Sequence, residues 1–136
     1  MSSNKANNGR YKRPARPKNA ASLLIYRQNR GQYEVLMGRR GSSAPFKPGV
    51  YVFPGGIMEK TDFQVQPISG LPSGVTQHLA VAHSYPFANA LAMTAIRETF
   101  EETGLLFGSP GKTIERVNHR SWNIFKEKKY VPIFDL

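Results

Sequence analysis

Three glutamates in the second half of the chain stand at a spacing that can do chemistry. Glu98, Glu101 and Glu102 occupy positions i, i+3 and i+4, so on an α-helix their carboxylates share one face. Like charges at this spacing repel, and no Lys or Arg stands four residues after any of them to offset the repulsion. Mg²⁺ and Mn²⁺ prefer oxygen ligands and would neutralise such a cluster. The spacing therefore predicts a divalent-metal site, with a solvated acidic helix face as the alternative.

Arg97 directly precedes this cluster and stands four residues before Glu101. A guanidinium at that spacing can hold a carboxylate in a fixed direction through paired hydrogen bonds. We expect Arg97 to orient a ligand rather than to react.

The chain has no cysteine, which excludes thiolate metal sites, disulfides and thiol nucleophiles.

A helix must carry the glutamates, and the segment from Phe87 to Gly104 consists of strong helix formers. We expect Asn89 to cap its start and Gly104 to end it in a left-handed turn. The residues Leu105–Phe107 then predict a new strand, and the segment before Pro132 is amphipathic and predicts a second helix.

Strands are expected earlier in the chain. Two apolar segments, one from Asn19 and one from Tyr33, predict a hairpin that turns at Gly31. A short strand over Val50–Gly56 is expected to end at Pro54. Residues 63–86 contain several prolines and glycines and predict an inserted loop with one helical turn near residues 76–82.

The order of these residues resembles the Nudix box, which reads glycine, five residues, glutamate, seven residues, and then R-E-U-x-E-E-x-G-U, where U is aliphatic. "FPGG" and "RETFEETGL" supply the matching positions, which are Gly56, Asp62, Arg97, Glu98, Glu101, Glu102, Gly104 and Leu105. Three departures stand out: aspartate replaces the first glutamate, Thr99 replaces an aliphatic residue, and the gap after Asp62 is much longer. A split box of this kind is similar to the branch that includes peroxisomal coenzyme A diphosphatase-like proteins.

The resemblance implies the α/β (α+β) class, as a sandwich of helices around a mixed sheet. It implies that Glu98, Glu101 and Glu102 bind Mg²⁺ or Mn²⁺, that the Gly55 carbonyl is a further metal ligand, and that Glu98 or a carboxylate outside the box is the general base. The implied reaction is hydrolysis of a pyrophosphate bond in a nucleoside diphosphate-linked substrate, with coenzyme A or an acyl-coenzyme A favoured. The expected contacts to substrate are Arg39, Arg40, Lys47 and Gly56, although solvated surface residues are an equal interpretation of the three basic ones.

The formal net charge of +10 is concentrated at the N-terminus, where no acidic residue occurs before Glu34. We expect residues 1–18 to form a basic disordered tail and residues 19–136 to form the Nudix domain. The alternative is a tail with a specific function, either RNA binding or targeting to an organelle. The composition shows no membrane span, and nucleic acid is an unlikely partner for the domain.

The box helix is followed by only about thirty residues, whereas Nudix domains continue with further strands and a second large helix. We therefore expect the fold to be incomplete at its C-terminus. An inactive Nudix-derived binding module and a basic nucleic-acid-binding protein remain competing hypotheses. The resemblance suggests an intracellular protein of peroxisomes or mitochondria, although "FDL" at the end is no peroxisomal signal. The oligomeric state is left open.

Overall fold

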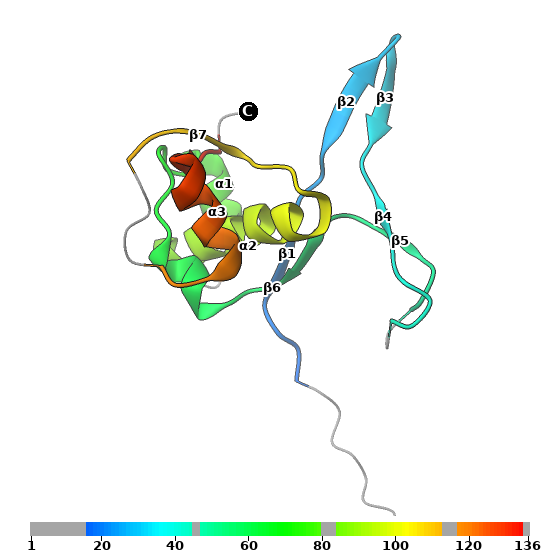
Figure 1. Ribbon diagram of the computed structural model, residues 1–136, viewed down its shortest axis with the longest axis horizontal. Helices are drawn as coiled ribbons and strands as arrows, with labels where there is room; N and C mark the ends of the chain where they lie inside the picture. The colour runs from blue at the N-terminus through cyan, green and yellow to red at the C-terminus, as the bar shows by residue number, and fades with distance from the viewer. Residues whose placement is uncertain (1–15, 45–46, 80–83, 113–116, 135–136) are drawn as a thin grey trace, which may run out of the picture.

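The computed structural model describes residues 16–44, 47–79, 84–112 and 117–134. In chain order its elements are β1 (Ala20–Ser22), β2 (Tyr26–Asn29), β3 (Gln32–Val35), β4 (Gly38–Arg39), β5 (Tyr51–Val52), β6 (Gly55–Ile57), the 3-10 helix η1 (Lys60–Gln64), α1 (Ser73–Leu79), α2 (Tyr85–Thr103), β7 (Gly108–Pro110), α3 (Arg120–Lys128) and β8 (Tyr130–Pro132). Helices and strands are mixed along the chain (Figure 1), which confirms the α/β class. No helix within these ranges has the length and apolar character needed to cross a membrane.

The described strands form four separate antiparallel pairs, β1 with β6, β2 with β3, β4 with β5 and β7 with β8. The mixed sheet that the resemblance implied is therefore not seen as one continuous sheet in these ranges. One reason is that the first apolar segment changes partner along its length. The Leu23 amide donates to the Pro54 carbonyl, whereas the Ile25 carbonyl accepts from the Leu36 amide, both at 2.9 Å. The single strand expected there is therefore divided into β1 and β2.

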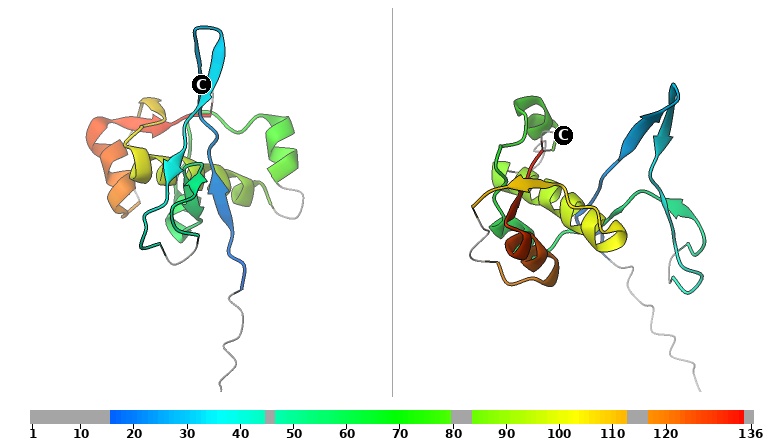
Figure 2. Two further views of the ribbon diagram at one scale, coloured as in Figure 1. Left: turned by 90° about the vertical axis from the view of Figure 1, so that its right-hand side faces the viewer. Right: turned by 45° about the horizontal axis from the view of Figure 1, so that its top comes forward.

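The hairpin of β2 and β3 turns at Arg30 and Gly31, which confirms the sequence prediction. Both residues have positive φ, 49° and 80°, as a two-residue turn between antiparallel strands requires. The hairpin projects away from the helices (Figure 2). Its residues are exposed on both faces, so its stability depends on pairs such as Tyr26 and Tyr33, whose rings meet edge to face at 5.6 Å.

Helix α2 lies at the centre of the fold, where it contacts β1, β6, η1, α1 and α3 (Figure 1). It ends at Gly104 with φ of 75°, as expected. Its start differs from the prediction, because Ser84 is the N-cap and Pro86 lies in the first turn, where proline is favoured. Asn89 is instead buried inside the helix, and its amide donates to the Val65 carbonyl at 3.3 Å.

The inserted segment 63–86 is more ordered than a loop. The expected helical turn exists as α1, although it begins three residues earlier than predicted, and residues 80–83 lie outside the described ranges. Val65, near the start of the insertion, is fully buried in the core. The insertion therefore contributes to the packing of the domain.

The core lies between α2 and the C-terminal elements. Its buried members are Val65, Met93, Ile96, Val117, Trp122 and Phe125. The helix expected before Pro132 is confirmed as α3, but Leu105–Phe107 form no strand, and β7 begins only at Gly108. Leu106 and Phe107 pack against the core instead. Their apolar side chains therefore contribute to the core at the point where the chain leaves α2.

Candidate active site

Arg97 and Asp62 form a buried ion pair that joins α2 to η1. The guanidinium donates from Nε to Asp62 Oδ1 at 2.8 Å and from Nη2 to Oδ2 at 3.1 Å. Both side chains are at most 1% exposed. The aspartate also accepts from the Thr94 hydroxyl and the Glu59 amide, both at 2.9 Å, and from the Trp122 indole at 3.3 Å. These donors satisfy both oxygens of the carboxylate, as a buried charge requires. Asp62 therefore has a structural role.

The second half of the Arg97 guanidinium reaches two of the clustered glutamates. Nη1 donates to Glu98 Oε1 at 2.9 Å and to Glu101 Oε1 at 3.1 Å, while Nη2 also donates to the Ile57 carbonyl at 2.9 Å. Burial alone would lower the pKa of Arg97, but the hydrogen bonds and charges of Asp62, together with Glu101 and Glu98, outweigh burial and raise it. The expected role of Arg97 as an orienting group fits these contacts. The contact of Arg97 with Glu101 was expected from their spacing, whereas its contact with the adjacent Glu98 was not.

Glu98 lies against β6, the strand that contains Gly55 and Gly56 and precedes η1. Its side chain is 16% exposed, and a Cβ added to Gly56 would lie 2.4 Å from its carboxyl carbon. A side chain at position 56 would therefore force the Glu98 carboxylate to turn away from this place. Burial raises the pKa of Glu98, and the negative charges of Glu101 and Glu102 raise it further against the opposing effect of Arg97.

Glu102 binds the other glycine of β6. The Gly55 amide donates to Glu102 Oε2 at 3.1 Å across 47 residues of sequence. Gly55 has φ of 158°, and a Cβ there would lie 2.4 Å from the Ala21 carbonyl oxygen. The two glycines of β6 and the end of α2 are thus brought together.

Glu101 is held by a residue that the sequence did not single out. The Ser121 hydroxyl, in the first turn of α3, donates to Glu101 Oε1 at 2.7 Å. Nothing in the sequence signals this contact, since a serine in an amphipathic helix has no distinctive spacing from the motif. Trp122, the next residue, is a fully buried core residue.

Each of the three glutamates thus has one oxygen held by a donor of the protein. In the described part of the chain, Arg97, Ser121 and the Gly55 amide are these donors. No group of three or more acidic or histidine side chains within the described ranges is close enough together to hold a metal ion. Glu98 and Glu101 share one donor, Arg97 Nη1, whereas Glu102 is held by the Gly55 amide, so Glu102 would have to turn for all three to share a cation.

A groove runs beside Glu102, between the end of α2 and the β4 and β5 pair. It has a volume of about 830 Å³, and its lining includes Arg39, Arg40, Gly55, Tyr51 and Glu102. Two of the three basic residues expected to contact substrate therefore share a groove with a candidate metal ligand. Lys47 and Gly56 are not part of its lining.

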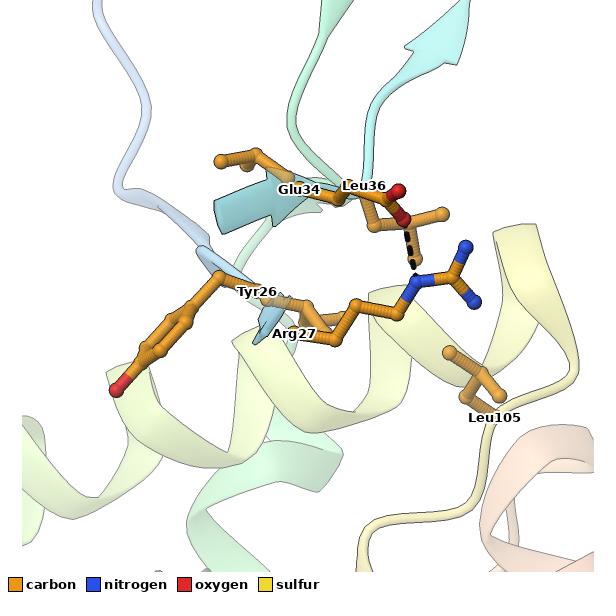
Figure 3. Close-up of a pocket in the computed structure, with 7 residues that line it drawn as sticks. Tyr26, Arg27, Glu34, Leu36 and Leu105 are labelled. Atoms are coloured by element: carbon orange, nitrogen blue, oxygen red, sulfur yellow. Dashed lines mark hydrogen bonds and ion pairs between the residues drawn. The ribbon is translucent and has the colours of Figure 1, made fainter. Parts of the chain in front are cut away.

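A smaller pocket lies at the base of the β2 and β3 hairpin (Figure 3). Leu105, which closes the motif, faces Leu36 and the ion pair of Arg27 with Glu34 there. The pKa of Glu34 is lowered by hydrogen bonds from Asn29 and Arg27. No residue of the candidate metal site lines this pocket, so we assign it no part in the chemistry.

The histidines of the insertion give no metal site in the described residues. His78 is exposed, and its Nδ1 lies 2.6 Å from the Gly74 carbonyl of its own helix. His83 lies outside the described residues.

Sequence comparisons find relatives among the Nudix hydrolases, although no family model matches the chain. Acyl-coenzyme A diphosphatase NUDT19 of Gallus gallus is 35% identical over 100 residues, covering 58% of this chain and 26% of that protein. The protein of the same name from Xenopus laevis is 34% identical, covering 60% and 27%. Putative nudix hydrolase 7 of Caenorhabditis elegans is 30% identical, covering 65% and 22%. The matches thus span about a quarter of each relative.

Among solved structures, a Nudix hydrolase from Alicyclobacillus acidocaldarius is similar, with a TM-score of 0.46 and 32% identity over 64% of this chain and 36% of that one. The chain is thus similar in sequence to proteins named acyl-coenzyme A diphosphatase and putative nudix hydrolase.

Proposed function

We propose that this chain binds Mg²⁺ or Mn²⁺ through Glu98, Glu101 and Glu102 and hydrolyses the pyrophosphate bond of a nucleoside diphosphate-linked substrate. The observation that carries the proposal is that the glycines of β6 meet the end of α2, through Gly56 against Glu98 and the Gly55 amide on Glu102. The three glutamates supply a donor set of carboxylate oxygens, which suits hard divalent cations. The Gly55 carbonyl remains a proposed further ligand.

The residues around the cluster have distinct roles in this proposal. Arg97 holds Glu98 and Glu101, so that the two carboxylates are already oriented before a cation binds. Arg39 and Arg40 line the groove beside Glu102 and would contact the phosphates of a substrate. A bound cation would lower the pKa of a water molecule and stabilise charge on the phosphates. The general base is Glu98 or a carboxylate outside the motif.

Coenzyme A or an acyl-coenzyme A is the substrate class that we favour. The support is the printed name of two relatives, acyl-coenzyme A diphosphatase. Because the matches span about a quarter of each relative, we propose the activity and the substrate for this chain rather than transfer them. A peroxisomal location rests on the same resemblance.

The test is a panel of pyrophosphate-linked compounds, including coenzyme A and an acyl-coenzyme A, assayed with Mg²⁺ and with Mn²⁺. We expect metal-dependent release of a phosphomonoester, abolished by Glu101→Gln or Glu102→Gln. Glu127→Gln is the matched control, because it removes an exposed glutamate of α3 that belongs to no part of the proposed site. Metal and ligand binding without any product would contradict hydrolysis and favour the inactive binding module.

A nucleic-acid-binding function is the second candidate that the charge of the chain suggests. The residues on which it depends lie mostly before residue 16, outside the described ranges. It predicts affinity for RNA that falls steeply with salt and disappears when residues 1–18 are deleted. If hydrolysis persists after this deletion while RNA binding is lost, the two functions depend on different parts of the chain.

A further inference from the structure

We propose that Ser121 of α3 is a positioning residue, whose hydroxyl holds the Glu101 carboxylate so that Oε2 is the oxygen presented to a cation. The inference rests on the proposed function, since it takes Glu101 as a metal ligand. It adds a role for a residue that lies outside the motif and follows Glu101 by twenty positions.

Two donors converge on the same oxygen of Glu101. The Ser121 hydroxyl lies 2.7 Å and Arg97 Nη1 lies 3.1 Å from Oε1. Arg97 cannot fix this carboxylate alone, because the same Nη1 also donates to Glu98 at 2.9 Å. The serine supplies a second hydrogen bond to the same oxygen, from another helix, and so restricts rotation of the carboxylate. Within the described ranges no donor reaches Oε2, so that oxygen is left for a cation.

Ser121 is itself held firmly in place. It is 6% exposed, and its amide donates to the His119 ring at 3.3 Å, at the N-cap of α3. The adjacent Trp122 is fully buried and donates to Asp62 at 3.3 Å. The first turn of α3 therefore contacts the Arg97 network on both sides, at Asp62 through the indole and at Glu101 through the hydroxyl.

The three glutamates differ in how they are held. Glu102 accepts from a backbone amide, that of Gly55, and Glu98 accepts from Arg97, which belongs to the motif. Glu101 alone among the three depends on a side chain of another helix in the described structure. Partners of this kind, which contact a metal ligand rather than the metal, commonly change metal affinity by about 10- to 100-fold when they are removed.

The test measures Mn²⁺ binding to the full chain by electron paramagnetic resonance, which counts free Mn²⁺ and does not depend on turnover. We expect Ser121→Ala to raise the Kd for Mn²⁺ by about 10-fold, the lower end of that range because Arg97 still holds Oε1. Ser121→Thr keeps the hydroxyl and should bind nearly as tightly as the unchanged chain. Asn123→Ala is the matched control on α3, because Asn123 makes no hydrogen bond to Glu101 among the described contacts, and it should leave the Kd unchanged.

Three results would overturn the proposal. If Ser121→Ala binds Mn²⁺ as tightly as the unchanged chain while Glu101→Gln still weakens binding, Ser121 has no positioning role. The proposed metal site would not be affected by that result. Equal losses for Ser121→Ala and Ser121→Thr would show that the hydroxyl is not responsible. Absence of any effect of Glu101→Gln would remove Glu101 as a ligand, and would count against the proposed function as well.

Discussion

The two glycines of β6 approach different kinds of neighbour. A Cβ on Gly55 would meet backbone atoms of β1, at 2.4 Å from the Ala21 carbonyl oxygen, whereas the three atoms nearest to a Cβ on Gly56 belong to the end of the Glu98 side chain. Backbone cannot move aside without breaking the pairing of β1 with β6, but a glutamate side chain can turn. One glycine is therefore needed for the fold and the other for the site.

This difference predicts opposite behaviour of two alanine variants. Gly55→Ala should lower the free energy of unfolding by about 1–3 kcal/mol, as overpacking against backbone does. Gly56→Ala should change it little but weaken Mn²⁺ binding, because Glu98 must turn away from its place. Urea unfolding and Mn²⁺ titration of both variants check this. Gly74→Ala, in a helix where a Cβ meets nothing within 4 Å, is the control and should stabilise slightly.

Glu98 should titrate above the ordinary range of glutamate. Its raised pKa has burial as the main cause, with the charges of Glu101 and Glu102 adding to it. Because the folded-state pKa is raised, the protonated form of Glu98 stabilises the fold, and this contribution is lost as pH rises through that pKa. The metal-free carboxyl can be followed by carbon-13 NMR. Glu101→Gln should lower the pKa of Glu98, whereas Glu127→Gln should not, and an unchanged pKa in the first variant would contradict the assigned cause.

At the scale of elements, the Arg97 network joins three segments that are far apart in sequence. Asp62 belongs to η1, Arg97 to α2, and Trp122 to α3. A buried aspartate that loses its cation is left with an uncompensated charge, so removal of one partner destabilises strongly. The same network that orients the glutamates therefore holds the helices together.

Arg97→Met should lower the free energy of unfolding by about 3–5 kcal/mol, the range for breaking a buried ion pair from one side. The measurement is urea unfolding at constant pH. Arg27→Met provides the contrast, because Arg27 and Glu34 form an exposed pair on the hairpin, with side chains 76% and 44% exposed. Exposed pairs contribute about 0–1 kcal/mol. Equal losses in the two variants would show that burial of the Arg97 pair does not matter.

At the scale of the whole molecule, cation binding to the end of α2 should stabilise the entire fold. Helix α2 contacts β1, β6, η1, α1 and α3, and the three glutamates repel one another near its C-terminal end, where the helix dipole also disfavours negative charge. A ligand that binds only the folded chain stabilises it by mass action. Cation binding at the site and the stability of the fold should therefore be linked.

Thermal unfolding in Mn²⁺ and in EDTA tests this link. At a Mn²⁺ concentration 100 times the Kd, the stabilisation should be about 2.7 kcal/mol, and the Tm should rise with Mn²⁺ concentration. Glu101→Gln should abolish most of the rise, whereas Glu127→Gln should keep it. A Tm that is the same in Mn²⁺ and EDTA for the unchanged chain would count against a metal site.

Some features of the fold are local and could be predicted. The hairpin at Gly31 and the end of α2 at Gly104 follow from residues that accept positive φ. The helix before Pro132 follows from its apolar spacing. The start of α2 could not be predicted in the same way. Asn89 is of a residue type favoured at N-caps, but its side chain forms a buried hydrogen bond to Val65 instead.

The sequence by itself determined that Glu98, Glu101 and Glu102 lie together, because glutamates at i, i+3 and i+4 share a helix face whatever surrounds the helix. Only the tertiary structure decided what holds them. Gly55 reaches Glu102 across 47 residues, and Ser121 reaches Glu101 across 20. Asp62 matched the motif by position, yet its pairing with Arg97 and Trp122 depends on how η1 and α3 pack. Helical spacing is a property of neighbouring residues, whereas these contacts depend on chain segments that meet only after folding.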